Sequence, residues 1–315
     1  MGDAAMISFR YHVVSLLAVL FALAAGVALG AGVLDDTGND QRAATRAPAT
    51  DSGTTEGEGT GLDTALLQSL APGLIANRLS GRAVTVVVLP DAASTAEKEW
   101  SSAVESAGGR VSGVVEVDGD LVDPAKKQLV DALGGQLENG AKSVTLPSGA
   151  STYDRIGALL GYAISTKKPG GDAPNAQAKS ILAGLSTAGL ASSDGDLTRR
   201  GGLVLIVGGE PSGNTATDQG TSSIVASIAA GIDTQSSGVV VVGPESAAGP
   251  GGILTGVRSD QAVGKAVSTV DSAEGAGGSV VVVGALVEQA GGGSGQYGVG
   301  DGATAVLPGS QGGGE

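Results

Sequence analysis

The chain has 315 residues, contains no cysteine, and carries a formal net charge of −14 from 32 acidic and 18 basic residues. This acidity argues against nucleic-acid binding, which depends on basic residues that displace counterions from phosphates. It argues equally against docking on anionic lipid through a polybasic patch. The lack of cysteine excludes disulfides, thiolate metal sites and a cysteine nucleophile.

The first predicted element is a membrane-spanning helix over residues 13–34, which contain no charged side chain. As a helix this run would be roughly 33 Å long, compared with a hydrocarbon core of about 30 Å. Arg10 precedes the run, and Asp35 and Asp36 follow it. The positive-inside rule therefore places residues 1–12 in the cytoplasm and the rest of the chain outside it.

A cleaved signal peptide is the alternative for this segment, with small residues near Ala31 as the cleavage site. The apolar run is longer than the usual signal-peptide core of about 7–15 residues, which favours an uncleaved anchor. Ala22, Gly26 and Gly30 recur every four residues and would share one face of the helix. Small residues allow close helix pairing in lipid, although a chain with 55 glycines also produces such stripes by composition.

Residues 35–61 are rich in Gly, Thr, Asp and Ala without apolar periodicity, and we expect a flexible linker there. Apolar residues in 62–79 predict a short helix interrupted or kinked at Pro72. Residues 291–315 form a predicted Gly-rich C-terminal tail.

Residues 62–290 contain predicted strands that alternate with predicted helices. Valine-rich segments predict strands at 83–89 and 111–117, and continuous apolar runs predict strands at 203–207, 239–242 and 280–283. Helices are predicted between them, one capped by Asp91 and another beginning with Asp123 and Pro124 and ending at Gly134. Alternation of this kind predicts an extracytoplasmic α/β domain with a doubly wound, mostly parallel, Rossmann-like sheet.

Three carboxylates each follow a predicted strand: Asp91, Glu210 and Glu245. Ligands of open α/β sheets bind beyond the carboxyl ends of strands, so these residues are a candidate site for a hard cation or a polar ligand. The alternative is ordinary helix capping and solvated loop charge.

Other chemistry has little support in the sequence. Copper prefers thiolate, thioether and imidazole ligands, yet the only His is His12 and the only Met residues are Met1 and Met6, all before the predicted membrane helix. No histidine remains outside to serve as the base of a nucleophilic triad. Gly293, Gly295 and Gly298 match GxGxxG but have no preceding strand or following helix in this prediction. We therefore predict no metal site, no cofactor and no enzymatic activity.

Four stretches carry a resemblance to a known family: residues 6–30, 81–92, 267–271 and 294–303, the last reading SGQYGVGDGA. Together they resemble the actinobacterial copper-transport protein B (MctB) family, whose members include SteB-type cell-envelope proteins. The GQYG run, Gly295, Gln296, Tyr297 and Gly298, is the family signature here. We expect it to form a structural turn with Tyr297 packed on the domain, and partner contact is the alternative.

The resemblance implies copper transport or homeostasis, and for SteB-type members a division complex with a SteA-like membrane partner. We therefore expect a single-pass envelope protein that acts by membrane anchoring and by contact with such a partner or with its own copies. A genuine copper-efflux component is one alternative. An extracytoplasmic ligand-binding domain or enzyme that uses the strand-end carboxylates is another.

Overall fold

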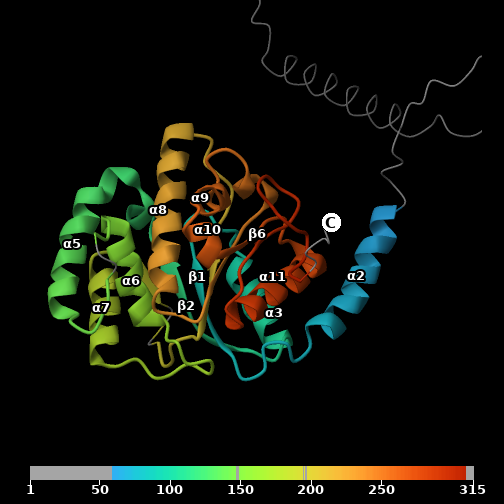
Figure 1. Cartoon of the computed structure of the whole chain (residues 1–315), viewed down its shortest axis with the longest axis horizontal. Coiled ribbons are helices and arrows are strands. Elements are labelled where there is room, and N and C mark those ends of the chain that lie inside the picture. Colours follow the sequence, from blue (N-terminus) through green and yellow to red (C-terminus); the bar gives the residue numbers. More distant parts are fainter. Residues whose placement is uncertain (1–58, 147–148, 194, 196, 310–315) are drawn as a thin grey trace, which may run out of the picture. The chain divides into compact units, whose positions relative to one another are not determined.

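The computed structural model describes residues 59–146, 149–193, 195 and 197–309, and these form an α/β fold (Figure 1). Seven strands make one sheet in the order β3-β2-β1-β4-β5-β6-β7. The strands are β1 (Ala83–Val88), β2 (Arg110–Val117), β3 (Ala191–Ser193), β4 (Leu203–Val207), β5 (Val239–Val242), β6 (Ser268–Val270) and β7 (Gln296–Tyr297). Neighbouring strands run parallel, except that β3 is antiparallel to β2. The predicted α/β class and mostly parallel sheet are confirmed.

Helices cover both faces of the sheet (Figure 1). The helices are α2 (Gly59–Ile75), α3 (Ala96–Ser106), α4 (Gly119–Val122), α5 (Lys127–Gly140), α6 (Thr152–Ile164), α7 (Ala176–Thr187), α8 (Thr215–Asp233), α9 (Ile253–Ser259), α10 (Val263–Ala266) and α11 (Gly275–Ala290). The core under one face includes residues of α5 to α9, and the core under the other includes residues of α2, α3 and α11. Because both faces are covered, every residue of β4 and β5 is buried, which explains their unbroken apolar sequences.

On the first face, α6 and α8 approach each other through glycines. A Cβ on Gly157 would lie 2.5 Å from the Ile228 carbonyl oxygen, and one on Gly231 would lie 2.6 Å from the Ala158 nitrogen. These distances are shorter than real Cβ contacts, so the two helix backbones meet only because both positions lack a side chain.

The predicted strand at 280–283 is wrong, because these four valines lie inside α11. A short apolar run does not distinguish a strand from a buried helix. Here the flanking residues continue the helix from Gly275 to Ala290, and Val281, Val282 and Val283 are buried within it. The strand that precedes this helix is β6, which the apolar pattern did not reveal.

Several predicted element ends also differ from the structure. Asp91 does not cap a helix, since α3 begins at Ala96 after Thr95. Asp123 does accept a hydrogen bond from the Ala125 N–H at 2.8 Å, but it caps a 3-10 turn, and α5 continues past Gly134 to Gly140. Helix α2 begins at Gly59, inside the predicted linker, and runs through Pro72 to Ile75.

Part of the predicted C-terminal tail belongs to the sheet. Residues 296–297 form β7, which pairs with β6, and the Ala305 carbonyl accepts a hydrogen bond from the Gly298 N–H. The residues after 309 lie outside the described part.

None of the helices within residues 59–309 that the structure describes is both long and apolar enough to cross a bilayer. The predicted membrane helix at 13–34, with Ala22, Gly26 and Gly30, lies outside the described residues, as does the predicted linker up to residue 58.

Candidate functional site

The order of the strands creates a crevice at the carboxyl edge of the sheet. Strands β1 and β4 are parallel neighbours, but β1 leads into α3 on one face and β4 leads into α8 on the other. The two connections diverge, which is the arrangement at which open α/β sheets bind ligands.

Asp91 and Glu210 come together at this crevice, one after β1 and one after β4. Their loops are in backbone contact, since a Cβ on Gly209 would lie only 1.5 Å from the Asp91 carbonyl oxygen. Gly209 is therefore required for the two loops to meet. Both carboxylate side chains are exposed.

A hollow of about 530 Å³ opens between these loops and the neighbouring helices. Its wall combines the buried ring of Trp100 from α3 with backbone from the ends of β4 and β5. Four carboxylates line it, namely Asp91, Glu99, Glu210 and Glu274, and no basic residue does. A hollow with this lining favours a ligand that carries positive charge or hydrogen-bond donors.

Glu245 does not line this hollow. It is exposed and begins the 3-10 turn Glu245–Ala248 after β5. Among the described residues, no group of three or more His, Cys, Asp or Glu side chains is placed to hold a metal ion. The structure therefore brings Asp91 and Glu210 to one hollow and does not place Glu245 among its lining residues.

Sequence analysis missed two acidic residues of the hollow, Glu99 and Glu274. Glu274 follows β6 and directly precedes α11, so the strand-end rule that selected Asp91 and Glu210 would also have selected it. It was missed because β6 was not predicted. Glu99 lies in the first turn of α3, one residue before Trp100, and no motif marks it.

A smaller hollow of about 230 Å³ lies on the other side of the Asp91 and Glu210 loops and is lined partly by Asp218 of α8. The Asp218 carboxylate is buried and accepts hydrogen bonds from the Ser212 N–H at 3.0 Å, the Ser212 hydroxyl at 2.6 Å and the Gly213 N–H at 3.0 Å. The hydrogen bond from the Ser212 side chain and those from the backbone hold the pKa of Asp218 below its ordinary value, against the opposing effect of burial. Asp218 thus fixes the loop that carries Glu210.

The signature residues Gly295, Gln296, Tyr297 and Gly298 lie in and beside β7. Tyr297 is buried, as predicted, and its hydroxyl donates to Glu288 of α11. Burial and the Glu288 carboxylate raise the pKa of Tyr297. Gln296 accepts from the Thr269 hydroxyl at 2.6 Å and donates to the Gly264 carbonyl at 2.8 Å. Through these contacts the signature residues stabilise the fold.

A buried ion pair holds the segment that follows the signature. Arg258 and Asp271 meet at 2.7 Å, with side chains only 4% and 0% exposed. Asp271 also accepts from the Val299 and Gly300 N–H groups at 2.7 and 2.9 Å. Burial alone would raise the pKa of Asp271, but these backbone hydrogen bonds and the Arg258 guanidinium hold it below its ordinary value. A Cβ on Gly298 would lie 2.2 Å from the Asp271 carboxylate, which explains the glycine there.

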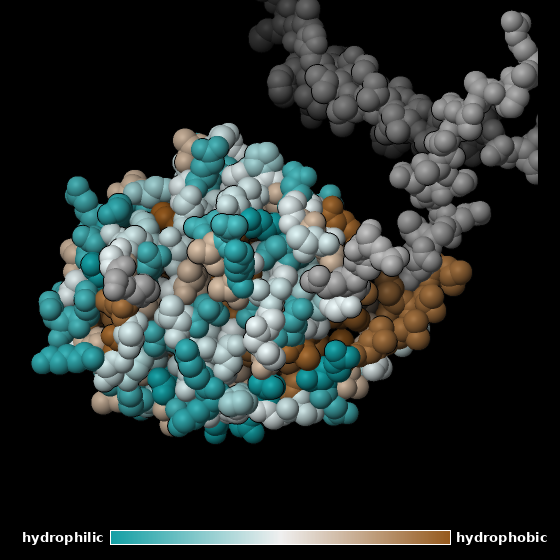
Figure 2. All heavy atoms as spheres, in the orientation of Figure 1, coloured by the Kyte–Doolittle hydropathy of each residue, from teal (hydrophilic) through white to brown (hydrophobic). Residues whose placement is uncertain are grey.

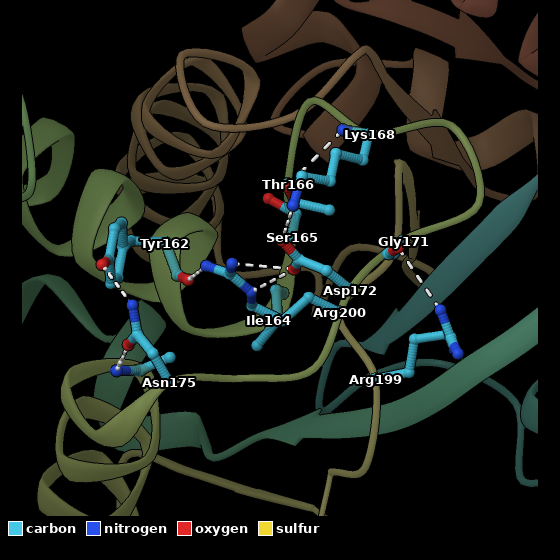
Figure 3. A network of polar contacts seen from close by, with 12 residues as sticks. Tyr162, Ile164, Ser165, Thr166, Lys168, Gly171, Asp172, Asn175, Arg199 and Arg200 are labelled. Atoms are coloured by element: carbon cyan, nitrogen blue, oxygen red, sulfur yellow. Dashed lines mark hydrogen bonds and ion pairs between the residues drawn. The ribbon is translucent and has the colours of Figure 1, made fainter.

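At the opposite edge of the sheet, a second polar cluster surrounds Arg200, just before β4 (Figure 3). Arg200 pairs with Asp172 at 2.7 Å, donates to the Tyr162 carbonyl at 3.0 Å and lies 5.4 Å from the Tyr162 ring centre. Lys168 binds the other Asp172 oxygen at 3.1 Å, and Asn175 donates to the Tyr162 hydroxyl at 2.8 Å. The groups of this cluster satisfy one another, so it braces the α6–α7 loop.

Comparisons with known proteins match nearly the whole chain. A family model described as "Copper transport outer membrane protein, MctB" matches residues 6–308. A protein of Mycobacterium tuberculosis (strain ATCC 25618 / H37Rv) named "Copper transporter MctB" is 29% identical over 323 residues, covering 96% of this chain and 99% of that protein. A protein of Mycobacterium leprae (strain TN) with the same name is 29% identical over 330 residues, with the same coverage.

Proposed function

Because the chain belongs to the MctB family of copper transport outer membrane proteins, we propose that it serves copper homeostasis as a membrane-anchored contact protein rather than as a copper carrier. In this proposal residues 13–34 anchor the chain with its N-terminus in the cytoplasm. The α/β domain stands outside the cytoplasm and binds other envelope components. A division-complex role of the SteB type, with a SteA-like membrane partner, would use the same contacts.

The observation that carries this proposal is the chemistry of the side chains after residue 12. They include no cysteine, histidine or methionine, the ligands that copper prefers. Carboxylates are the remaining candidate ligands, and in the described residues they do not gather into a metal-binding group. A copper effect of this protein is thus more readily explained through a partner than through direct binding.

An enzymatic role has no comparable support, and we propose that the chain is not an enzyme. The crevice contains carboxylates without a histidine or lysine among its lining residues. Carboxylates can act as general bases, but no nucleophile motif accompanies them in the sequence.

The test has two arms, both with the full-length chain. A Cu(I) titration against a competing chelator is expected to detect no stoichiometric site of nanomolar affinity, in the wild type or in a His12→Ala control that removes the only imidazole. A deletion strain is expected to lose copper tolerance and to regain it with either version. A tight site would contradict the contact role, and unchanged copper tolerance of the deletion strain would contradict the link to copper.

A second candidate function is the binding of a cationic ligand, such as an amine or a basic peptide segment, in the carboxyl-edge crevice. The observation that favours it is the acidic lining of the 530 Å³ hollow beside the Trp100 ring. Ligands screened by the fluorescence of Trp100, the only tryptophan, should bind the wild type and lose affinity for Glu210→Gln. Glu245→Gln, which lies outside the hollow, is the matched control. Equal affinity of the two variants would show that the ligand does not bind in the crevice.

A further inference from the structure

Helix α2 leaves a row of leucines uncovered. Leu62, Leu66, Leu70 and Leu74 are 72%, 52%, 51% and 53% exposed, and we call these four residues the leucine row. Figure 2 shows the corresponding apolar surface as a continuous brown area over α2. Apolar areas of this kind on a soluble surface mark interaction sites.

Another side of α2 is partly covered by this chain. Ala71 and Ile75 are buried, and Leu67, although still 44% exposed, lies over α11, with its Cδ1 atom 3.6 Å from where a Cβ on Gly277 would stand. Helix α2 is therefore apolar on two sides, and α11 covers part of only one. A helix that is apolar on both sides is normally buried on both.

The sequence of α2 argues against a lipid surface as the missing cover. Among its 17 residues Asp63 is the only charged one, and there is no lysine or arginine. Helices that lie on a membrane surface usually carry basic residues on their polar face, which bind the lipid headgroups. The acidic net charge of the chain opposes such binding further.

The spacing of the leucines suits a second copy of the same helix. Residues four apart form a ridge, and two such ridges interdigitate when the helices cross at about −50°. The same ridge on both partners gives a self-complementary, two-fold contact. At a crossing of this kind the central residues Leu66 and Leu70 lie nearest their counterparts, and Leu62 and Leu74 lie farther away.

The position of α2 in the chain strengthens this choice. It is the first described helix after the proposed anchor, and 24 residues of sequence, 35–58, separate the two. If these residues form the flexible chain expected from their sequence, their root-mean-square reach is roughly 27 Å. Two copies whose anchors lie side by side would therefore present their leucine rows at effective concentrations in the millimolar range, so even a small contact would form.

From these observations we infer that α2 is a self-association surface, through which two copies pair at Leu66 and Leu70 outside the membrane. The orientation of the pair rests on the proposed anchor, but the contact itself does not. Pairing through the leucine row would complete the burial of α2 and join the domains of two anchored chains.

Cysteine crosslinking of the full-length chain in its own membranes tests this surface, and the lack of native cysteine makes each variant a single-thiol probe. Leu66→Cys and Leu70→Cys place the thiol at the inferred crossing. Gln68→Cys, also exposed on α2 but on another side of the helix, is the matched control. Diamide oxidation is expected to give a covalent dimer of twice 30.2 kDa several times faster at the two leucine positions than at Gln68.

Three outcomes would overturn the inference. Equal rates at all three positions would mean that membrane proximity alone brings the chains together. A product of another mass would show that a different protein covers the row. Absence of any product would show that the row is uncovered. Fractionation of the same samples reports separately on the anchor, because a chain found in the soluble fraction contradicts the proposed anchoring while its crosslinking pattern can still be read.

A second measurement guards against effects of the cysteines. Two differently tagged copies should co-purify, and a Leu66→Gln, Leu70→Gln pair of changes should reduce the recovered partner severalfold. Ala65→Gln, on another exposed side of α2, should leave recovery unchanged. Equal recovery from all three proteins would also overturn the inference.

Discussion

The two faces of the sheet are covered in different ways. On the α6–α8 face, glycines bring two helices into backbone contact, and Ile228 and Ile232 are buried between them and the sheet. On the other face, α11 is covered by α2, but α2 itself leaves the leucine row exposed. On the first face, α6 and α8 pack against each other within one chain. On the second face, the leucine row needs a further partner to become buried. The difference separates the part of the molecule that stabilises the fold from the part that is free for contact.

Removal of Arg258 should have the largest effect on stability. Arg258→Ala would leave the fully buried Asp271 carboxylate without its cation and the Tyr297 and Asp301 carbonyls without the guanidinium that donates to them. Breaking a buried pair by removing one partner typically costs about 3–5 kcal/mol. Chemical denaturation should show a loss of that size, while Lys126→Ala, which breaks an exposed pair with Asp120, should change stability by less than about 1 kcal/mol.

A methyl group between α6 and α8 should have the next largest effect. In Gly231→Ala the new Cβ would lie 2.6 Å from backbone atoms of α6, so the helices must separate at an expected cost of about 1–3 kcal/mol. Gly73→Ala in α2 is the control on the other face, because no atom lies within 4 Å of its Cβ position. That change should stabilise the protein by about 0.5–1 kcal/mol, as alanine favours helix. Similar losses for both variants would contradict the contrast between the faces.

Acid should weaken the β6–β7 edge of the sheet through Asp271. Its pKa in the folded protein is below the ordinary value of 3.8, so the folded state favours the charged form. The resulting stabilisation is complete above pH 3.8 and is lost as the pH falls through the lower, folded-state pKa. The free energy of unfolding should therefore fall more steeply below about pH 4 in the wild type than in Asp271→Asn. Parallel profiles for the two proteins would show that Asp271 is not responsible.

Polar changes in the leucine row should have the smallest effect on the folding of one chain. In Leu66→Gln, Leu70→Gln the replaced side chains are already half exposed, so at concentrations where the protein is monomeric the stability should change by no more than about 0.5 kcal/mol per site. Thermal unfolding measured over a dilution series would check this predicted stability change. A loss of several kcal/mol in the monomer would mean that the row belongs to the core of a single chain.

The sequence predicted much of the sheet because β1 and β2 are rich in valine and because β4 and β5 are continuous apolar runs. Strands β4 and β5 match their predicted bounds, and β1 and β2 match within a residue. The short strands β6 and β7 were missed, since Ser268, Thr269 and Gln296 are buried through side-chain hydrogen bonds that no apolar pattern displays. Strand β3 was missed because its sequence, Ala-Ser-Ser, is short and mostly polar. The valines of α11 were assigned to a strand for the converse reason, because a buried helix is as apolar as a buried strand.

The candidate crevice was predicted in part. The strand-end rule found Asp91 and Glu210, which line the hollow, but it also selected Glu245, which begins a 3-10 turn and is not among the lining residues. Glu274 was not selected, because the strand that precedes it, β6, was not predicted. The leucine row was visible as apolar residues in the sequence, but whether such a row faces the core or solvent depends on tertiary packing.

Hydrogen–deuterium exchange tests the contrast between the two faces most directly. The full-length chain would be reconstituted in lipid nanodiscs that hold either one copy or two. The account predicts that α2 amides between residues 62 and 74 exchange more slowly in two-copy discs, whereas α8 amides exchange at the same rate in both. Equal protection of α2 in one-copy and two-copy discs would contradict the claim that a second copy completes this face.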